Sequence, residues 1–363
     1  MKILQIIQRS QLRGAEIFAC QLSECLQQQG YEVDVLVLFG PSTTLFNFPL
    51  NFIFLEANEK KRWWDFKNYA KLASVIKKGQ YDLVQANAGD TLKYASLSKK
   101  IFGWKAKLVF RNANKISDFI NSTLKKRMNS WLMKEVSSVA SVSKECLIDF
   151  QHTYPGFENR ISCLPIGVVN KTQSPYSSLA EIGLNGNGPF LLHVAGFMPE
   201  KNHTGLISIF SELLKTHPGA KLLLIGEGKL KTSTENIVKE LALDKSILFL
   251  GKRDDVMRIM LCCDAFLLPS ITEGLPGVIL EAFASGLPVV AYDTGGIKEV
   301  VIPRETGWLI DLRDQNQFLE AIKEVLSQKQ EKIISNAHAL VSNKYDINSI
   351  TQKFIAFYEK TMA

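Results

Sequence analysis

Residues 269–286 have the sequence PSITEGLPGVILEAFASG, in which an apolar strand ends and an apolar helix begins. The strand ends near Pro269, a loop carries Glu273, and the segment from Gly274 to Gly277 opens the helix, with a proline suited to a first turn. Free N–H groups at the start of a helix carry a partial positive charge, and glycine lets an anion come close to the backbone. This stretch therefore predicts an anion site shaped for a diphosphate.

Short apolar runs alternate with longer amphipathic stretches on both sides of this segment. The expected strands are 2–8, 32–38, 51–55, 83–86, 107–110, 139–142, 161–164, 190–194, 221–225, 247–250, 265–268, 289–291 and 307–310. The expected helices include 15–29, 65–78, 121–134, 202–215, 236–243, 255–261, 278–284 and 314–326. Such alternation predicts an α/β fold of two Rossmann-like, doubly wound domains that face a central cleft. Ligands of such sheets bind beyond the carboxyl ends of the strands.

A polar stretch over 169–188 separates the two regions of alternation. We therefore expect an N-terminal, acceptor-binding domain over 1–168, a linker and surface loop over 169–188, and a C-terminal, nucleotide-sugar-binding domain over 189–344. The last segment, 345–363, has the apolar spacing of an amphipathic helix, which either closes the second domain or packs back on the first.

The charge of the chain is uneven. Its net charge is +7, of which residues 1–165 contribute +9 and the remainder −2. A basic first half attracts anionic partners such as acidic substrates, membrane phosphates or nucleic acid. Nucleic-acid binding would leave the diphosphate stretch unexplained, so no nucleic-acid partner is expected.

Two segments of the first half mix cations with aromatic rings, namely KKRWWDFKNYAK at 60–71 and KKRMNSW at 125–131. This mixture suits an anionic membrane surface, and the alternative is a solvated helix whose tryptophans pack in the core. No segment has the roughly 20 continuous apolar residues of a membrane span, and residues 1–9 predict a strand rather than a signal peptide. We expect a cytoplasmic protein, with the inner face of the membrane as its docking surface.

Glu281 lies one turn inside the apolar helix that follows Gly277. A carboxylate in such a helix needs a partner, and two adjacent ribose hydroxyls would satisfy both of its oxygens. The alternative is a buried Lys or Arg partner for Glu281, with Glu273 merely solvating its loop.

Lys201 lies in HVAGFMPEKNH, residues 193–203, where a strand end leads through a turn into a helix. It can neutralise phosphate oxygens, and a charge-assisted hydrogen bond is worth roughly 1.5–3 kcal/mol. The alternative is an exposed lysine.

The GEG at 226–228 lacks the third glycine of a dinucleotide fingerprint, so a tight strand-to-helix turn is preferred there. Arg13-Gly14-Ala15-Glu16 places another helix N-terminus after the first strand, where Gly14 lets a ligand approach.

The order of these stretches, with Asp293-Thr294-Gly295-Gly296 and Glu299 behind them, resembles glycosyltransferase family 4. That family consists of retaining enzymes with the GT-B fold of two Rossmann-like domains. The resemblance covers essentially the whole chain. It is specific in the second half, through EGLPGVILEAFASGLPVV with two glutamates eight residues apart, and looser in the first half.

The resemblance implies a role for each candidate residue. Glu273 would position the donor sugar, Lys201 would stabilise the leaving diphosphate, and Glu281 would hold the ribose hydroxyls. The backbone of the loop and helix start would bind the sugar and diphosphate, through Gly274, Leu275, Pro276, Gly277 and Val278. Arg253 lies in the loop expected along the nucleobase, and Gly14 and Ala15 would approach the phosphates. The family usually needs no metal, and the sequence has no D-x-D motif, so neither a metal nor a resident cofactor is expected.

Two positions depart from the family pattern. Gly196 stands where the family commonly has an arginine beside the lysine, and Arg253 or Arg13 would have to substitute for it. A histidine that faces the reacting centre in many members is absent after a first-domain strand, where Arg111 and Asn112 stand instead. The acceptor-side candidates are therefore Arg13, Arg111 and Asn112.

Together these features predict a retaining transfer of a hexose-type sugar from a nucleotide diphosphate donor, with UDP favoured by the family's habits. The leaving phosphate would act as the base for the acceptor hydroxyl. The basic first half favours a saccharide acceptor, with a lipid-linked one as an option, in cell-envelope or exopolysaccharide biosynthesis. Two alternatives stay open: a nucleotide-sugar epimerase or hydrolase on the same fold, and a non-catalytic partner that binds nucleotide or saccharide.

Overall fold

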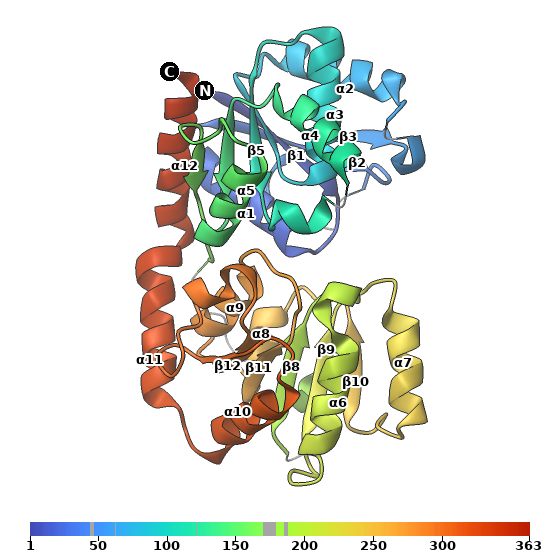
Figure 1. Cartoon of the computed structure of the whole chain (residues 1–363), viewed down its shortest axis with the longest axis vertical. Helices are drawn as coiled ribbons and strands as arrows, with labels where there is room; N and C mark the ends of the chain where they lie inside the picture. Colours follow the sequence, from blue (N-terminus) through green and yellow to red (C-terminus); the bar gives the residue numbers. More distant parts are fainter. Residues whose placement is uncertain (44–46, 62, 121, 170–178, 185–187) are drawn as a thin grey trace. The chain divides into compact units, whose positions relative to one another are not determined.

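The computed structural model describes residues 1–363 except 44–46, 62, 121, 170–178 and 185–187. It divides into two compact units (Figure 1), of which the first is Met1–Val169 with Ile347–Ala363 and the second is Asn170–Asp346. Most of the expected linker over 169–188 falls outside the described residues, as does the first residue of the expected helix over 121–134. Within that linker, Leu179–Ile182 forms a short 3-10 helix.

The first unit is built on a seven-stranded parallel sheet in the order β3-β2-β1-β4-β5-β6-β7. Its strands are β1 (Lys2–Arg9), β2 (Glu32–Phe39), β3 (Asn51–Ala57), β4 (Leu83–Ala86), β5 (Lys107–Asn112), β6 (Ser138–Ser141) and β7 (Ile161–Cys163). Its helices are α1 (Gly14–Gln28), α2 (Phe66–Gly79), α3 (Gly89–Phe102), α4 (Thr123–Met133), α5 (Lys144–Thr153) and α12 (Ile347–Met362). The strand order reverses between β1 and β4, and ligands of such sheets bind at this point.

The helix α12 belongs to the first unit, where it runs beside α1 (Figure 1). The ring of Phe354 lies 5.9 Å from that of Phe18 in α1. The hydroxyl of Tyr358 donates to Oε1 of Gln85 in β4 at 2.7 Å and accepts from Nε2 of Gln5 in β1 at 3.3 Å. Apolar packing and a buried polar network therefore both fix α12 on the sheet of the first unit.

The second unit is built on a six-stranded parallel sheet in the order β10-β9-β8-β11-β12-β13. Its strands are β8 (Phe190–Val194), β9 (Lys221–Ile225), β10 (Ile247–Gly251), β11 (Ala265–Leu268), β12 (Val289–Tyr292) and β13 (Trp308–Ile310). Its helices are α6 (His203–Leu213), α7 (Lys231–Glu240), α8 (Val256–Met260), α9 (Gly277–Ala284), α10 (Gln315–Ser327) and α11 (Glu331–Leu340). Here the order reverses between β8 and β11.

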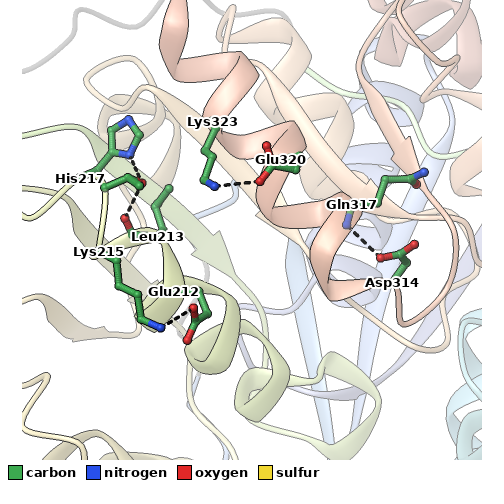
Figure 2. A network of polar contacts seen from close by, with 9 residues as sticks. Glu212, Leu213, Lys215, His217, Asp314, Gln317, Glu320 and Lys323 are labelled. Carbon is green, nitrogen blue, oxygen red and sulfur yellow. Dashed lines mark hydrogen bonds and ion pairs between the residues drawn. The ribbon is translucent and has the colours of Figure 1, made fainter.

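The exposed sides of α6 and α10 carry ion pairs and a helix cap. On α6 and the turn after it, Lys215 pairs with Glu212 at 2.7 Å, and on α10 Lys323 pairs with Glu320 at 2.8 Å (Figure 2). The carboxylate of Asp314 caps α10 by accepting from the N–H of Gln317 at 2.9 Å. The inner faces of α6 and α10 pack on the sheet, among residues such as Leu206, Phe210, Phe318 and Ile322. The predicted class of fold, two Rossmann-like domains with parallel sheets, is confirmed.

Among the described residues, no helix combines the length and the apolar character needed to cross a membrane.

Candidate active site

The two loops that leave the switch point of the second sheet carry the charged pair of the candidate site. Lys201 follows β8, Glu273 follows β11, and Nζ of Lys201 lies 2.6 Å from Oε1 of Glu273. The Glu273 side chain is only 7% exposed and that of Lys201 is 23% exposed. Charges this far from water are held only when they are paired. The structure thus brings together two of the predicted site residues that are 72 positions apart.

Backbone contacts hold these two loops against each other. The N–H of Ile271 donates to the carbonyl of Glu200 at 2.8 Å, and Nδ2 of Asn202 donates to the carbonyl of Pro269 at 3.1 Å. Asn202 adopts φ +56°, a left-handed conformation that asparagine tolerates, and its Oδ1 accepts from the N–H of Gly205 to cap α6. Lys201 therefore projects from a turn with little freedom.

The segment after β12 braces the Glu273 loop. Gly295 has φ +56°, and a Cβ atom there would overlap the carbonyl oxygen of Glu273, so only glycine fits. The N–H of Gly296 donates to the carbonyl of Gly274 at 2.6 Å, and Oγ1 of Thr294 donates to the carbonyl of Ile271 at 2.8 Å. In the sequence these residues entered only through the family resemblance, and the structure shows their packing role.

The helix α9 begins at Gly277, with Pro276 in an extended conformation before it. The first N–H groups of a helix have no acceptor within it, so they remain available to an anion. Gly274 and Leu275 are buried, whereas Pro276, Gly277 and Val278 are half-buried. The N–H of Ile279 donates to the carbonyl of Pro276 at 3.2 Å, whereas those of Gly277 and Val278 have no acceptor among the described residues.

Glu281 is half-buried on α9, and no hydrogen bond or ion pair reaches its carboxylate from the part of the chain that the structure describes. Burial raises the pKa of this carboxyl from its ordinary 4.5 to about 7. The alternative of a buried Lys or Arg partner therefore has no counterpart among the described residues. A ligand with two hydroxyl donors would satisfy this group.

The turn after β9 packs against the segment before Lys201. A Cβ atom at Gly226 would overlap the carbonyl of Ala195, and one at Gly228 would overlap the backbone of Phe197. This is the tight turn that the sequence favoured over a dinucleotide fingerprint. A Cβ atom at Gly196, in contrast, would meet the Glu227 carbonyl oxygen at 3.4 Å, which is ordinary contact. The position that departs from the family pattern thus has room for a side chain.

Arg253 lies in the loop after β10. Its Nε and Nη2 donate to the two carboxylate oxygens of Asp255, at 2.7 and 2.5 Å. These two hydrogen bonds fix the guanidinium. If Arg253 took over the role of the arginine missing at Gly196, its guanidinium would have to bind Asp255 and the diphosphate together. Its predicted place along the nucleobase stays a prediction.

Two buried imidazoles lie beneath the Lys201 turn. Nδ1 of His193 is 2.8 Å from the carbonyl of Leu267, and the ring of His203 stacks on Phe197 with centroids 4.1 Å apart. Burial lowers the pKa of His193 to about 4 and that of His203 to about 3, and the charge of Lys201 adds to both shifts. Both rings are neutral near pH 7, so they are poor acids there. In the described residues, no group of three or more His, Cys, Asp or Glu could hold a metal ion.

The predicted residues of the first unit fall into two groups. Arg13 and Gly14 are exposed at the start of α1, beside the switch point of the first sheet, and Ala15 is half-buried. Arg111 and Asn112 end β5 and are 1% and 2% exposed. The amide of Asn112 donates to Oγ of Ser141 and to the carbonyl of Cys146, at 3.1 and 3.2 Å. An acceptor contact by these two side chains stays a prediction.

Comparisons with known proteins identify the family of the chain. Residues 12–170 match the family model described as Glycosyltransferase Family 4, and residues 178–340 match the one described as Glycosyl transferases group 1. The UDP-Gal:alpha-D-GlcNAc-diphosphoundecaprenol alpha-1,3-galactosyltransferase of Escherichia coli is 24% identical over 314 residues, 81% of this chain and 79% of that protein. The N-acetyl-alpha-D-glucosaminyl L-malate synthase of Bacillus anthracis is 31% identical over 150 residues, which span 41% of this chain and only 39% of that protein.

Among solved structures, HepE of Anabaena in complex with UDP-glucose superposes with a TM-score of 0.84 at 22% identity. The superposition covers 99% of this chain and 100% of that one, which establishes the fold. The two family matches together span nearly the whole chain, and the chain therefore belongs to the group 1 and family 4 glycosyltransferases, enzymes built on the GT-B fold.

Proposed function

We propose that this glycosyltransferase moves a hexose-type sugar from UDP to a lipid-linked saccharide, with retention of the anomeric configuration, in the assembly of a cell-envelope glycan. The observation that carries the proposal is the buried pair of Lys201 and Glu273 at the switch point of the second sheet. Glu273 lies four residues before the start of α9, and this set of groups offers N–H donors to a diphosphate and a carboxylate oxygen to a sugar hydroxyl.

Lys201 is proposed to stabilise the departing diphosphate. An ammonium group has three N–H donors, and Glu273 accepts one of them at 2.6 Å, which leaves two for phosphate oxygens. The charge on the leaving group grows as the anomeric bond breaks, so fixed donors aimed at it lower the barrier without reorganising. The first N–H groups of α9 would act on the same oxygens.

Glu273 is proposed to position the donor sugar. Its Oε1 is occupied by Lys201, and none of the described side chains or backbone groups bonds to Oε2. That oxygen can accept a hydrogen bond from a sugar hydroxyl. The brace from Gly295 and Gly296 holds the loop in place while it does so. With no separate base assigned, the leaving phosphate would take the proton of the acceptor hydroxyl, as the family resemblance implies.

Uridine is proposed as the base from two sources. The Escherichia coli relative is named for UDP-Gal, and the HepE structure contains UDP-glucose. Glu281 would hold the ribose, because its unpartnered carboxylate can accept from two adjacent hydroxyls. No described residue selects uracil by itself, so the base rests on the names of these proteins.

A lipid-linked acceptor is supported by the surface of the first unit. On α4, Leu124 is 76% exposed and Trp131 is 46% exposed, and Lys126, Arg127 and Lys134 line a groove with Trp131. In the segment 60–71, of which residue 62 lies outside the description, Trp64 is 78% exposed. Trp64 and Trp131 thus lie outside the core, whereas the neighbouring Trp63 packs partly buried against it, as the alternative expects. The two exposed rings, with the cations beside them, suit an anionic membrane. The Escherichia coli relative is named for a diphosphoundecaprenol acceptor.

Calorimetric binding of UDP, UDP-galactose, UDP-glucose and GDP-mannose tests the proposal. The wild-type chain should bind the uridine nucleotides, and Glu281→Ala should remove the binding. Lys215→Ala is the matched control, because Lys215 forms an exposed ion pair on the same unit. Binding of GDP-mannose alone would refute the choice of base. Binding of a donor with no transfer to any saccharide would favour the non-catalytic alternative.

A further inference from the structure

Arg111 is a buried cation that the proposed mechanism does not use. Its side chain at the end of β5 is 1% exposed, and neither Nε nor Nη1 has a hydrogen-bond partner among the described residues. Burial lowers its pKa to about 10, which leaves it charged near pH 7. A buried charge without hydrogen bonds costs stability unless nearby groups stabilise it electrostatically.

The groups that do so lie near the start of α1. The guanidinium carbon of Arg111 lies 4.4 Å from the centre of the Phe18 ring, within the range of a cation–π contact. Burial raises the pKa of the Glu16 carboxyl, which is 5% exposed, and the charge of Arg111 opposes that shift; the ionised Glu16 in turn favours the charged form of Arg111. Phe18 is backed by Phe354 of α12, with ring centroids 5.9 Å apart.

The first turn of α1 has no side-chain cap among the described residues. Arg13 stands at the capping position without a side-chain hydrogen bond, and both Arg13 and Gly14 are exposed. An uncapped helix start normally frays, because its first N–H groups have no acceptor. Arg111 contacts this helix at Phe18, about one turn after its start. Within the first turn, Oε1 of Glu16 accepts a hydrogen bond from Nε2 of Gln11 at 2.9 Å.

We propose that Arg111 is a positioning residue, which holds the first turn of α1 through Phe18 and Glu16 and thereby fixes the backbone of Gly14 and Ala15 for the donor phosphates. The inference rests on the proposed function and on the family resemblance, which implies that Gly14 and Ala15 approach the donor phosphates. Arg111 itself touches no substrate in this account. Its removal acts on turnover through α1.

Hydrogen exchange of the amides over 13–20 tests the structural half of this proposal. Arg111→Met should speed their exchange, and Glu16→Gln, which removes the partner charge from the other side, should do the same. Arg111→Lys keeps the charge and should restore part of the protection. Leu132→Ala is the control, since Leu132 is buried in the same unit among the residues of the opposite face of the sheet. It should lower the melting temperature without altering exchange over 13–20.

Two measurements test the effect of Arg111 on function: the rate of UDP release from UDP-galactose or UDP-glucose, and the affinity for UDP by calorimetry. A misplacement of about 1 Å can cost about 100-fold in rate, so Arg111→Met should lower kcat at least about 10-fold. The Kd for UDP should rise less than kcat falls, because Lys201, Glu281 and the start of α9 keep their proposed contacts with the nucleotide. Wild-type exchange and wild-type kcat in Arg111→Met or Glu16→Gln would overturn the inference, as would an equal loss of kcat in Leu132→Ala. A wild-type chain that neither binds nor turns over UDP-sugars would instead overturn the proposed function, while the exchange data would still decide the role of Arg111 at α1.

Discussion

The affinity for a UDP-sugar should depend on the protonation of Glu281. Burial raises the pKa of this carboxyl to about 7 in the free protein. Two ribose hydroxyls that donate to the carboxylate favour its charged form, so the bound state should return the pKa towards 4.5. Binding therefore releases a proton, and the affinity falls as the pH drops below about 7.

The size of the effect follows from these two pKa values. If the carboxyl titrates at about 7 when free and at about 4.5 in the complex, the affinity falls about 20-fold between about pH 7.5 and pH 5.5. The stability of the free protein depends on pH in the opposite sense, because a raised pKa means that the folded state binds the proton more tightly than the unfolded chain does. Its stability therefore declines as the pH rises from 4.5 towards 7, and a bound donor offsets that decline.

Calorimetry with UDP-glucose at several pH values measures this dependence. UDP-glucose is preferred to UDP because a terminal phosphate monoester itself titrates near pH 6. His193 and His203, with pKa values of about 4 and 3, stay neutral across the interval and add no slope. Glu281→Gln keeps the shape of the side chain without the charge and should bind more weakly with a flat pH profile. A wild-type affinity that does not change with pH, or the same slope in Glu281→Gln, would refute the reasoning.

Three further results are expected. Lys201→Ala should lower kcat by about 100-fold or more, because one preorganised donor on developing charge is worth about 3–4 kcal/mol. The rate of UDP release measures this loss, and an equal loss in Lys215→Ala would argue against the role of Lys201. Gly196→Arg should fold with a wild-type melting temperature, since a Cβ atom there makes only ordinary contacts. Calorimetry should show UDP binding about 10-fold tighter. Weaker binding would contradict the space found at this position. Trp131→Ser should reduce flotation with vesicles of anionic lipid at low salt, and the buried Trp104 is unchanged in this variant. An unchanged flotation would remove Trp131 from the docking surface.

Much of the fold could be predicted because strands of parallel sheets are buried on both faces and form continuous apolar runs. The runs at Leu83–Ala86, Phe190–Val194, Lys221–Ile225 and Ala265–Leu268 have the bounds that the apolar pattern predicts. The expected helix at 236–243 begins earlier, at Lys231, because its first turns are polar and lie near the surface. The helix α3 has a weaker apolar pattern, since its buried side includes Thr91, Ser96 and Ser98, whose hydroxyls interrupt it.

The site was predictable in its residues but not in its geometry. Glu273 and Lys201 could be proposed from their loops, yet only the tertiary fold brings their side chains to 2.6 Å. The need for glycine at Gly295 comes from a carbonyl 22 residues away, which no local pattern shows. Arg111 is harder still, because arginine is a surface residue by type, and its burial follows from the packing of α1 and α12 on the sheet.

The role of Glu273 is the central claim, and transfer and UDP binding measured side by side in Glu273→Ala test it most directly. If Glu273 positions the donor sugar, transfer from the UDP-sugar should be abolished while the calorimetric affinity for UDP largely survives, because the nucleotide contacts at α9 and Glu281 remain. Loss of transfer and of UDP binding together, with a fall in melting temperature, would show instead that Glu273 only holds the loop together with Lys201.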